Sequence, residues 1–340
     1  MTSRKLIAPH RYAIEQSPLF QLSNKKKLAS LLNIDISLIS SPDKSKLTSQ
    51  YRIFVDQKTK RFITEPVGDL KAIHEKLLKL FSRIAPPDYI HSAIKRRSYI
   101  TNADVHRESK NILKIDIKKF FPSINFYYIH DFFLNTLKCS PDIATILAKV
   151  CTVNTKKYGT HLPTGSCISP ILSFLANKKL FDAIKNACEK EDCKLTLYVD
   201  DITISGENAS PALLTIIAME IFNCGYGYHK IKVYKNQPAT ITGLIVNDGK
   251  IYLPHERVKK IRELVDALDI SVGPLRQQML ASLVGRLSEA EHINLRYKGM
   301  RIRIVSKYRK EWNEIVAART EKARLAREKR KRALHNSKKK

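Results

Sequence analysis

The stretch of sequence that decides the fold reads Leu195-Thr-Leu-Tyr-Val-Asp200-Asp201-Ile-Thr-Ile-Ser205. Apolar, β-branched and aromatic residues fill both halves, so the stretch predicts a β-hairpin with the two acids at its bend. Two carboxylates this close raise each other's pKa unless a cation compensates them. An isolated Asp-Asp pair is most often a solvated turn, but a pair inside an apolar hairpin indicates a cation-binding site.

A third acid ends a second predicted strand. Residues 111–117 form an apolar run that closes on Asp116 and continues into Phe120-Phe121. Hard oxygen ligands without histidine or thiolate select Mg²⁺, with Mn²⁺ as the alternative. Two such ions about 4 Å apart can activate a 3′-hydroxyl and stabilise a leaving pyrophosphate. The three acids together therefore indicate nucleotidyl transfer.

A loop between these two segments strengthens that interpretation. It reads Leu162-Pro-Thr164-Gly165-Ser-Cys-Ile-Ser169-Pro, and its Pro, Gly and Ser residues predict a fixed turn before a helix. Backbone N–H groups at such a helix start can meet a base or a phosphate. Taken alone, the loop would be an ordinary helix-capping turn.

The charge balance points to a polyanionic partner. The 340 residues carry 61 Lys and Arg against 32 Asp and Glu, a net charge of +29. Residues 319–340 hold eleven Lys and Arg and two Glu, or +9, so the remainder keeps +20. RNA or DNA is the expected partner, and an anionic membrane is the alternative.

Cysteine spacing and hydropathy indicate the compartment. None of the six cysteines forms a C-x-x-C pair or completes a zinc signature, which favours reduced thiols. The first ten residues lack the apolar stretch of a signal peptide. No uninterrupted apolar run approaches the ~18 residues of a membrane helix. We expect a soluble, cytoplasmic protein without a membrane partner.

Periodicity predicts an α+β fold rather than a regular βαβ alternation. Residues 1 to about 45 read as polar and helical, and Asn247-Asp248-Gly249 predicts a hairpin turn within 240–253. Two short strands are expected within 51–67, and a basic tail that is disordered until RNA binds from Arg319 onward. Helical spacing of apolar residues predicts helices in 70–81, 126–150, 169–190, 210–224, 258–268 and 279–287.

In this order the segments resemble the palm motifs of reverse transcriptases. Asp116 falls in the first motif, Leu-Pro-x-Gly in the second and Tyr198-Val-Asp-Asp in the third. Arg61-Phe-Ile-Thr-Glu-Pro is similar to the fingers segment whose basic residue grips triphosphate. His229-Lys-Ile-Lys232 is similar to the motif whose lysine sits near the nucleotide's phosphates. The likeness covers roughly residues 50 to 255.

Within that family the bacterial retron type fits best. Asn102-Ala-Asp-Val-His106 is similar to the Asn-Ala-x-x-His element of retron enzymes, and Ile241-Thr242-Gly243 to their Val-Thr-Gly element. Residues 154–161 lie where retron enzymes carry an extra insertion. A purely structural role for His106, as a packing histidine, stays open as the alternative.

The resemblance implies a right-hand polymerase with fingers, a palm of antiparallel sheet plus helices, and a short helical thumb. The expected divisions are an N-terminal helical extension at 1–50, fingers at 51–110, palm at 111–254 with part of the fingers interleaved, thumb at 255–318 and a basic tail at 319–340. No fused effector domain is expected, because 255–340 is assigned to thumb and tail.

The resemblance also implies residue roles at the active site. Asp116, Asp200 and Asp201 would hold two Mg²⁺ ions, with the Ile117 carbonyl adding an oxygen, and Lys232 would donate a proton to pyrophosphate. Phe121 would reject a ribose 2′-hydroxyl, while Phe120 packs in the core. The other expected nucleotide-binding residues are Arg61, with Lys58 or Lys60 as backup, Thr164, Gly165 and Tyr198.

RNA contacts are expected from several segments. The resemblance suggests a role for Asn102, His106, Thr242 and Gly243, and a basic helix near residue 259 can follow a duplex backbone without reading its sequence. The expected basic contacts are Lys259, Lys260 and Arg262, and a second strip of Arg296, Lys298, Arg301 and Arg303. Their bland interpretation is a solvated surface.

Two positions depart from the family pattern. Thr164 stands where the usual loop has Gln, which shortens its reach, and Val199 stands where retron enzymes often have Ala. Neither change removes a metal ligand, so activity is expected.

The expected function is RNA-directed DNA polymerisation of the retron type. The enzyme would use dNTPs to copy part of a cognate structured noncoding RNA into branched, RNA-linked single-stranded DNA. The resemblance further implies anti-phage defence with a separate effector protein. The alternatives are another bacterial reverse transcriptase, of the group II intron-like or abortive-infection type, and a non-catalytic RNA-binding protein on a polymerase fold.

Overall fold

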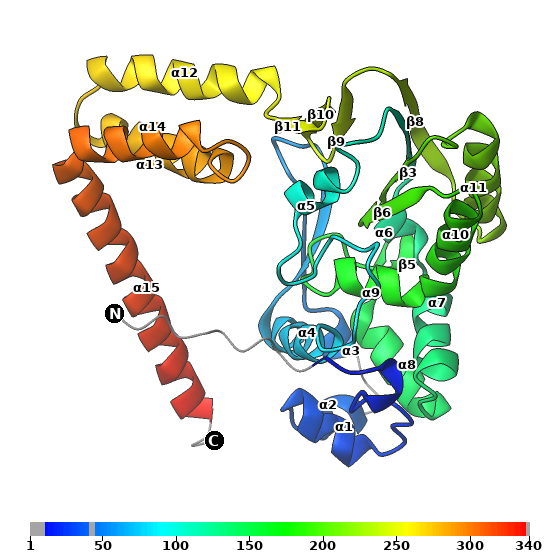
Figure 1. Ribbon diagram of the computed structural model, residues 1–340. Helices are drawn as coiled ribbons and strands as arrows, with labels where there is room; N and C mark the ends of the chain where they lie inside the picture. The colour runs from blue at the N-terminus through cyan, green and yellow to red at the C-terminus, as the bar shows by residue number, and fades with distance from the viewer. Residues whose placement is uncertain (1–10, 41–44, 338–340) are drawn as a thin grey trace. The chain divides into compact units, whose positions relative to one another are not determined.

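The computed structural model describes residues 11–40 and 45–337, which Figure 1 draws as a ribbon. The chain divides into two compact units, Met1–Thr242 and Gly243–Lys340. Parts of the expected N-terminal extension (1–10 and 41–44) and the last three residues of the expected tail lie outside the described residues. The α+β class is confirmed in the described chain, which combines antiparallel sheets with many helices.

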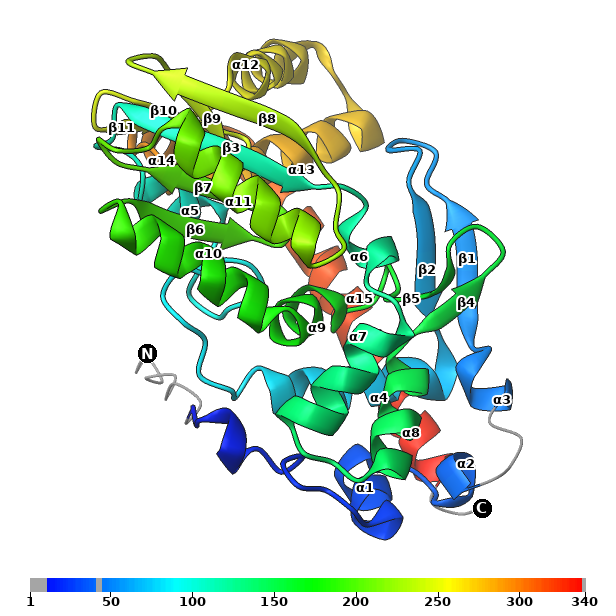
Figure 2. The same cartoon turned by 90° about the vertical axis from the view of Figure 1, so that its right-hand side faces the viewer.

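A four-stranded antiparallel sheet organises the first unit. Its strand order is β6 (Lys194–Tyr198), β7 (Asp201–Ser205), β3 (Asn111–Ile117) and β8 (Tyr228–Lys235), visible edge to edge in Figure 2. The register pairs Asp116 with Asp201 across β3 and β7, and Tyr198 with Asp201 across the hairpin. Side chains alternate between the faces of a strand, so this register brings acids distant in sequence to one end of the sheet.

Helices cover one face of this sheet. α10 (Lys178–Lys190) packs on β6, and α11 (Pro211–Asn223) packs on β3 and β8, as Figure 2 shows. Leu180, Phe181, Ile184 and Cys188 recur at helical spacing on α10 and are buried, which is the stripe that an amphipathic helix turns to a core. The shorter α9 (Ser169–Ala176) begins directly after the Leu-Pro-Thr-Gly loop and is almost wholly buried.

The expected strand pair 51–67 and the helix after it are confirmed. β1 (Tyr51–Val55) and β2 (Phe62–Pro66) pair antiparallel, and α4 (Gly68–Phe81) follows with Leu70, Ile73 and Leu77 fully buried. The remaining elements before β6 are η1 (Ile14–Gln16), α1 (Lys25–Leu32), α2 (Ser37–Ser40), α3 (Ser45–Thr48), α5 (Tyr99–Asp104), α6 (Phe120–Ser123), α7 (Phe126–Asp131), the π-helical turn η2 (Phe132–Thr136), α8 (Pro141–Cys151), β4 (Val153–Thr155) and β5 (Gly159–His161).

Two strands differ from expectation. β8 was not expected as a strand, because its alternation lacks a buried face and most of its side chains are exposed. The first strand of the hairpin predicted within 240–253 is interrupted: β9 (Ala239–Ile241) ends where Thr242 and Gly243 take positive φ values of 43° and 77°. Left-handed backbone interrupts a pleated ladder, so the chain turns there before β10 (Leu244–Asn247).

The second unit begins with a short hairpin and continues as four helices within its described residues. β10 and β11 (Lys250–Tyr252) confirm the predicted hairpin, and its turn residues Asp248 and Gly249 both take positive φ, as a tight primed turn requires. α12 (His255–Ile270), α13 (Gly273–Ala290), α14 (Arg296–Lys307) and α15 (Arg309–Ser337) pack through α13.

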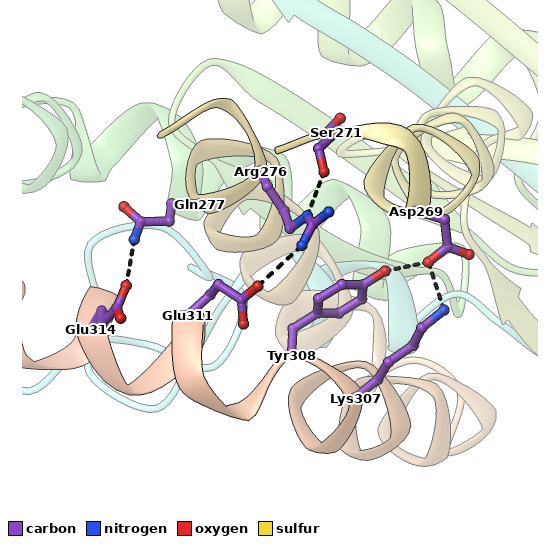
Figure 3. Close-up of polar contacts among 8 residues, drawn as sticks. All are labelled: Asp269, Ser271, Arg276, Gln277, Lys307, Tyr308, Glu311 and Glu314. Atoms are coloured by element: carbon purple, nitrogen blue, oxygen red, sulfur yellow. Dashed lines mark hydrogen bonds and ion pairs between the residues drawn. The ribbon is translucent and has the colours of Figure 1, made fainter. Parts of the chain in front are cut away.

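Polar contacts join the start of α15 to its neighbours (Figure 3). Arg276 pairs with Glu311 at 3.3 Å, Gln277 donates to Glu314 at 2.7 Å, and Lys307 pairs with Asp269, which also accepts from Tyr308. Beyond these contacts the α15 side chains described from residue 316 to 327 are exposed.

The expected disorder from Arg319 onward is wrong for the described residues, because α15 remains helical through Ser337. The segment is rich in Ala, Glu, Lys and Arg, which are good helix formers. Arg324 also pairs with Glu321 at 2.7 Å and with Glu328 at 3.0 Å, and such pairs stabilise a helix.

A bilayer span is absent from the described helices: none combines the length and apolar character that crossing requires.

His106 forms hydrogen bonds with both strands of the β6–β7 hairpin. Its ring is fully buried, with Nδ1 2.7 Å from Ser205 Oγ on β7 and Nε2 2.7 Å from Thr196 Oγ1 on β6. Asn102 is also fully buried, and neither its amide nitrogen nor its oxygen has a partner among the described atoms. The packing interpretation of His106 therefore fits, and the expected direct RNA contact by these two side chains is corrected, because neither reaches the surface.

We predict that His106→Ala lowers the free energy of unfolding by about 3 kcal/mol, because it opens a cavity and leaves two buried hydroxyls unpaired. Burial lowers the pKa of His106 to about 3. A depressed histidine pKa gives stability that is present above the unfolded pKa near 6.5 and is lost as pH falls toward the folded pKa.

Urea unfolding between pH 7.5 and pH 5 measures both effects, with exposed His292→Ala as the control. Wild type and the control should weaken more on acidification than His106→Ala. If the free energy of unfolding depends on pH identically in all three proteins, His106 is not the buried neutral histidine that links stability to pH.

Candidate active site

The β6–β7 turn and the end of β3 carry the three acids. Val199 takes a φ of 63°, and its N–H donates to Ser92 Oγ at 3.0 Å. Left-handed backbone is unusual for a β-branched residue, and such strain concentrates at functional sites. The Asp200 carbonyl accepts from the Ile117 N–H at 2.9 Å, which ties the turn to β3. The sheet thus fixes Asp116, Asp200 and Asp201 around one point.

Burial and mutual repulsion make these acids costly. Burial, followed by the charge of Asp116, raises the pKa of Asp200 to about 6, while Arg61 acts in the opposite direction. Burial also raises the pKa of Asp201, against the lowering effect of Lys114. Asp201 Oδ1 is buried without a hydrogen-bond partner among the described atoms. A site with these properties favours a bound cation.

Basic side chains contact the acids in this structure. Lys114 Nζ lies 2.9 Å from Asp201 Oδ2, and only 14% of its side chain is exposed. His229 Nδ1 lies 3.0 Å from Asp116 Oδ1 and 3.1 Å from the Asp116 carbonyl oxygen, and Lys230 Nζ lies 3.8 Å from Asp116 Oδ2.

Sequence reasoning missed all three of these side chains. The signal for Lys114 was present, because a residue two positions before Asp116 on a strand shares its face. His229 and Lys230 required the register of β8.

A bulge in β8 explains which lysine reaches the acids. The register changes between Lys114 and Asp116, which pair with Lys232 and His229 respectively, and Lys230 in between takes a φ of 52°. Bulges redirect side chains and are frequent beside active sites. Lys230 lines the cavity and Lys232 is not among its lining residues, so the lysine side chain of β8 that lies beside the acids is Lys230, whereas the sequence prediction named Lys232.

A cavity of about 670 Å³ opens over the acids. It gathers most of the nucleotide-binding residues expected from the sequence. The expected residues among its lining are Lys60, Arg61, Phe121, Thr164, Tyr198 and Thr242, together with the three acids. Lys58 is not in the lining and lies in the exposed β1–β2 turn, where its N–H donates to Asp56. Phe120 is buried against Phe181 and Tyr226, as expected of a core residue.

The Pro-Thr-Gly loop is fastened to β2. Thr164 Oγ1 donates to the Phe62 carbonyl at 2.8 Å and accepts from the Thr64 N–H at 3.1 Å, and the Thr164 N–H donates to Thr64 Oγ1 at 3.0 Å. A Cβ on Gly165 would come within 2.9 Å of Ile63 and 3.1 Å of the Thr64 carbonyl, so only glycine fits. The short Thr164 side chain holds β2, and with it the cavity wall at Arg61.

The expected RNA-binding residues are divided between the two units. Thr242 lines the cavity, and its hydroxyl donates to the Tyr99 carbonyl at 2.9 Å; Gly243 begins the second unit. In that unit Arg301 is paired with Glu291 at 2.8 Å. The exposed members are Lys259, Lys260, Arg262, Arg296, Lys298 and Arg303, of which Lys260 pairs with Glu263 at 3.0 Å.

The acids suit a divalent cation by chemistry. Among the described residues, no group of three or more Asp, Glu, His or Cys side chains is arranged to hold a metal ion. The donors are nonetheless carboxylate oxygens, including the partnerless Asp201 Oδ1, in the oxygen-only set that Mg²⁺ prefers. The donor chemistry of Asp116, Asp200 and Asp201 therefore fits such an ion.

Comparison with known proteins finds a family model and several relatives. Residues 42–238 match the family described as Reverse transcriptase (RNA-dependent DNA polymerase). Retron Se72 reverse transcriptase of Salmonella heidelberg (strain 579083-10) is 29% identical over 61% of this chain, which spans 57% of that relative's length. Two relatives come from Escherichia coli. The Retron Ec86 reverse transcriptase is 26% identical over 72% of this chain and 73% of the relative's length. The Retron Ec73 reverse transcriptase is 28% identical over 69% of this chain and 79% of the relative's length.

We predict that Asp200→Asn stabilises the protein in EDTA near neutral pH. A raised carboxyl pKa gives stability that is present below the unfolded pKa near 4 and lost as pH rises through the folded pKa of about 6. At pH 7.5 wild type therefore bears a cost of roughly 3 kcal/mol, which a neutral amide avoids.

Melting temperatures at pH 7.5 with EDTA or Mg²⁺ provide the measurement, with exposed Asp266→Asn as the control. Mg²⁺ should raise the melting temperature of wild type and the control but not that of Asp200→Asn. If EDTA gives all three proteins the same melting temperature, the acids are not under strain.

Proposed function

The chain belongs to the reverse transcriptase (RNA-dependent DNA polymerase) family, and on that premise we propose that it copies part of a cognate structured noncoding RNA into single-stranded DNA. The observation that carries the proposal is the convergence of Asp116, Asp200 and Asp201 on one cavity with Arg61 and Phe121. Its retron relatives support a product in which the DNA is joined to a 2′-hydroxyl of the RNA.

The proposed architecture is a right hand with fingers at 51–110, a palm at 111–254, a thumb at 255–318 and a basic segment from 319. Support comes from the paired strands β1 and β2 beside the cavity and from the acids on the central sheet. The helical composition of the second unit is consistent with a thumb.

Asp116, Asp200 and Asp201, together with the Ile117 carbonyl, would hold two Mg²⁺ ions and would supply them with oxygen ligands only. Such ions supply Lewis acidity, lowering the pKa of an attacking 3′-hydroxyl and neutralising the leaving pyrophosphate. Arg61 binds triphosphate as a charge-assisted donor. Lys230 takes the role of proton donor to pyrophosphate, because it lines the cavity next to Asp116.

Two aromatic residues would shape the sugar and primer positions. Phe121 lines the cavity beside the buried Phe120, and a large ring under the sugar leaves no room for a ribose 2′-hydroxyl. Tyr198 packs near the primer end, next to the strained turn at Val199. Thr164 and Gly165 contribute by holding the loop against β2. Specificity for dNTPs would therefore depend on the Phe121 ring and on the position of β2.

RNA binding is proposed for exposed basic side chains of the second unit. Lys259, Lys260 and Arg262 on α12, with Arg296 and Lys298 on α14, are exposed, and cations so placed contact phosphates without reading sequence. Arg301 contributes less, because Glu291 engages it. We further propose a cytoplasmic enzyme that acts with a separate effector protein in anti-phage defence.

Two other functions make different predictions. A group II intron-like or abortive-infection reverse transcriptase would polymerise without forming a branched RNA–DNA product. A non-catalytic RNA-binding protein would carry RNA alone. The strain at Asp200 favours catalysis over the second alternative, because an inactive scaffold gains nothing from repelling acids.

We predict that the protein, purified after expression of its native locus, carries DNA covalently joined to RNA. RNase should shorten this nucleic acid without destroying it, and DNase should remove the remainder. Gel analysis with and without a 2′,5′-debranching enzyme identifies the branch. The variant Asp200→Ala/Asp201→Ala should carry RNA only.

Unbranched DNA would contradict the retron assignment while leaving polymerisation intact. RNA alone on the wild-type protein would contradict both.

A further inference from the structure

A lysine–aromatic cluster lies in the wall of the active-site cavity, at the turn between β4 and β5. Lys157 Nζ is 5.2 Å from the centroid of the Phe62 ring and 5.1 Å from that of Tyr158, and Lys119 Nζ is 5.7 Å from the Tyr158 centroid. The two rings meet edge to face at 5.8 Å. All four residues line the same cavity as the three acids.

The cavity wall carries four basic side chains that form no ion pair with a described carboxylate. Lys60, Arg61, Lys119 and Lys157 all line it, and within residues 11–40 and 45–337 none of the four has a carboxylate within salt-bridge distance. By contrast Lys114 and Lys230, also near the acids, are paired with them. Lys157 and Lys119, which both lie over the Tyr158 ring, repel each other, and an anion bound between them would offset that repulsion.

The hairpin holds its lysine in a defined place. β4 and β5 pair from Val153–His161 to Thr155–Gly159, and Asn125 bridges to His161. His161 is fully buried, and its ring stacks edge to face on Tyr158 at 5.5 Å. Cation–π contact with two rings restrains the flexible lysine stem. The neighbouring Lys156 is exposed, does not line the cavity and makes no cation–π contact with either ring.

We propose that Lys157 and Lys119, supported by Phe62 and Tyr158, form a phosphate-binding subsite of the active site. The ligand is a phosphate group, and the triphosphate of the incoming nucleotide is the favoured source because the subsite shares a cavity with Arg61 and the acids. The phosphate backbone of the template RNA is the other source. The inference rests on the proposed polymerase function and assigns the β4–β5 hairpin a direct part in substrate binding.

The matched variants are Lys157→Gln and Lys156→Gln, which remove one charge each from adjacent positions of the same turn. Tyr158→Leu removes the ring that restrains Lys157 without changing charge. Three quantities are measured for each full-length protein: the KM for dTTP and kcat on an RNA template, the inhibition constant of inorganic pyrophosphate, and the Kd for primer–template at several salt concentrations. Melting temperatures verify that each variant is folded.

Lys157→Gln should raise the KM for dTTP and the inhibition constant of pyrophosphate about three- to tenfold, since it removes one charge-assisted contact. Its kcat should change little, and Tyr158→Leu should give a smaller change of the same kind. Lys156→Gln should match wild type. An unchanged KM with a weaker primer–template Kd, whose salt slope falls by about one, would support the subsite with RNA as the source of the phosphate.

If Lys157→Gln equals Lys156→Gln in all three quantities, no phosphate subsite exists here, although the wild-type activity would still uphold the polymerase function. Pyrophosphate binding by calorimetry separates the two failures. A wild-type protein that makes no DNA but binds pyrophosphate more tightly than Lys157→Gln would keep the subsite and reject the polymerase.

Discussion

Repulsion among Asp116, Asp200 and Asp201 constrains the sheet that carries them. The strands β3, β6 and β7 hold these carboxylates in partial burial, where the pKa of Asp200 rises to about 6. Much of the surrounding structure opposes this cost: Lys114 reaches Asp201, the β8 bulge turns Lys230 to Asp116, and buried His106 fastens the hairpin from below. Strained sites of this kind persist only when their surroundings over-determine them, and the gain is an oxygen-rich site ready for divalent cations.

Local patterns predicted most of the elements that position the acids. The strand 111–117, the hairpin with Asp200 at its bend and the helix ending at Phe81 were all read from periodicity, and the structure has them. Each depends on interactions between residues close in sequence, such as alternation, helical spacing and turn chemistry. The motif order also predicted which side chains share a cavity, because Arg61, Phe121, Thr164 and the acids do line one.

Features that depend on pairing between distant segments could not be predicted in the same way. β8 is largely exposed and has no periodic signal, so the place of Lys230 beside Asp116 follows only from its register with β3. Asn102 and His106 were expected to contact RNA, with packing as the alternative for His106, and both side chains are fully buried. Thr164 was expected to contact substrate, and its hydroxyl donates a hydrogen bond to the Phe62 carbonyl of β2. The basic segment from Arg319 is helical because its own ion pairs favour a helix, which net charge alone obscures.

The most direct test of the central claim is primer extension on an RNA template with dNTPs and Mg²⁺. Wild type should extend the primer, as should Asp266→Ala, which removes an exposed acid in the second unit. Asp200→Ala/Asp201→Ala should give no product above the background without enzyme, although it should remain folded. Equal product from wild type and from Asp200→Ala/Asp201→Ala would contradict the assignment of catalysis to these carboxylates.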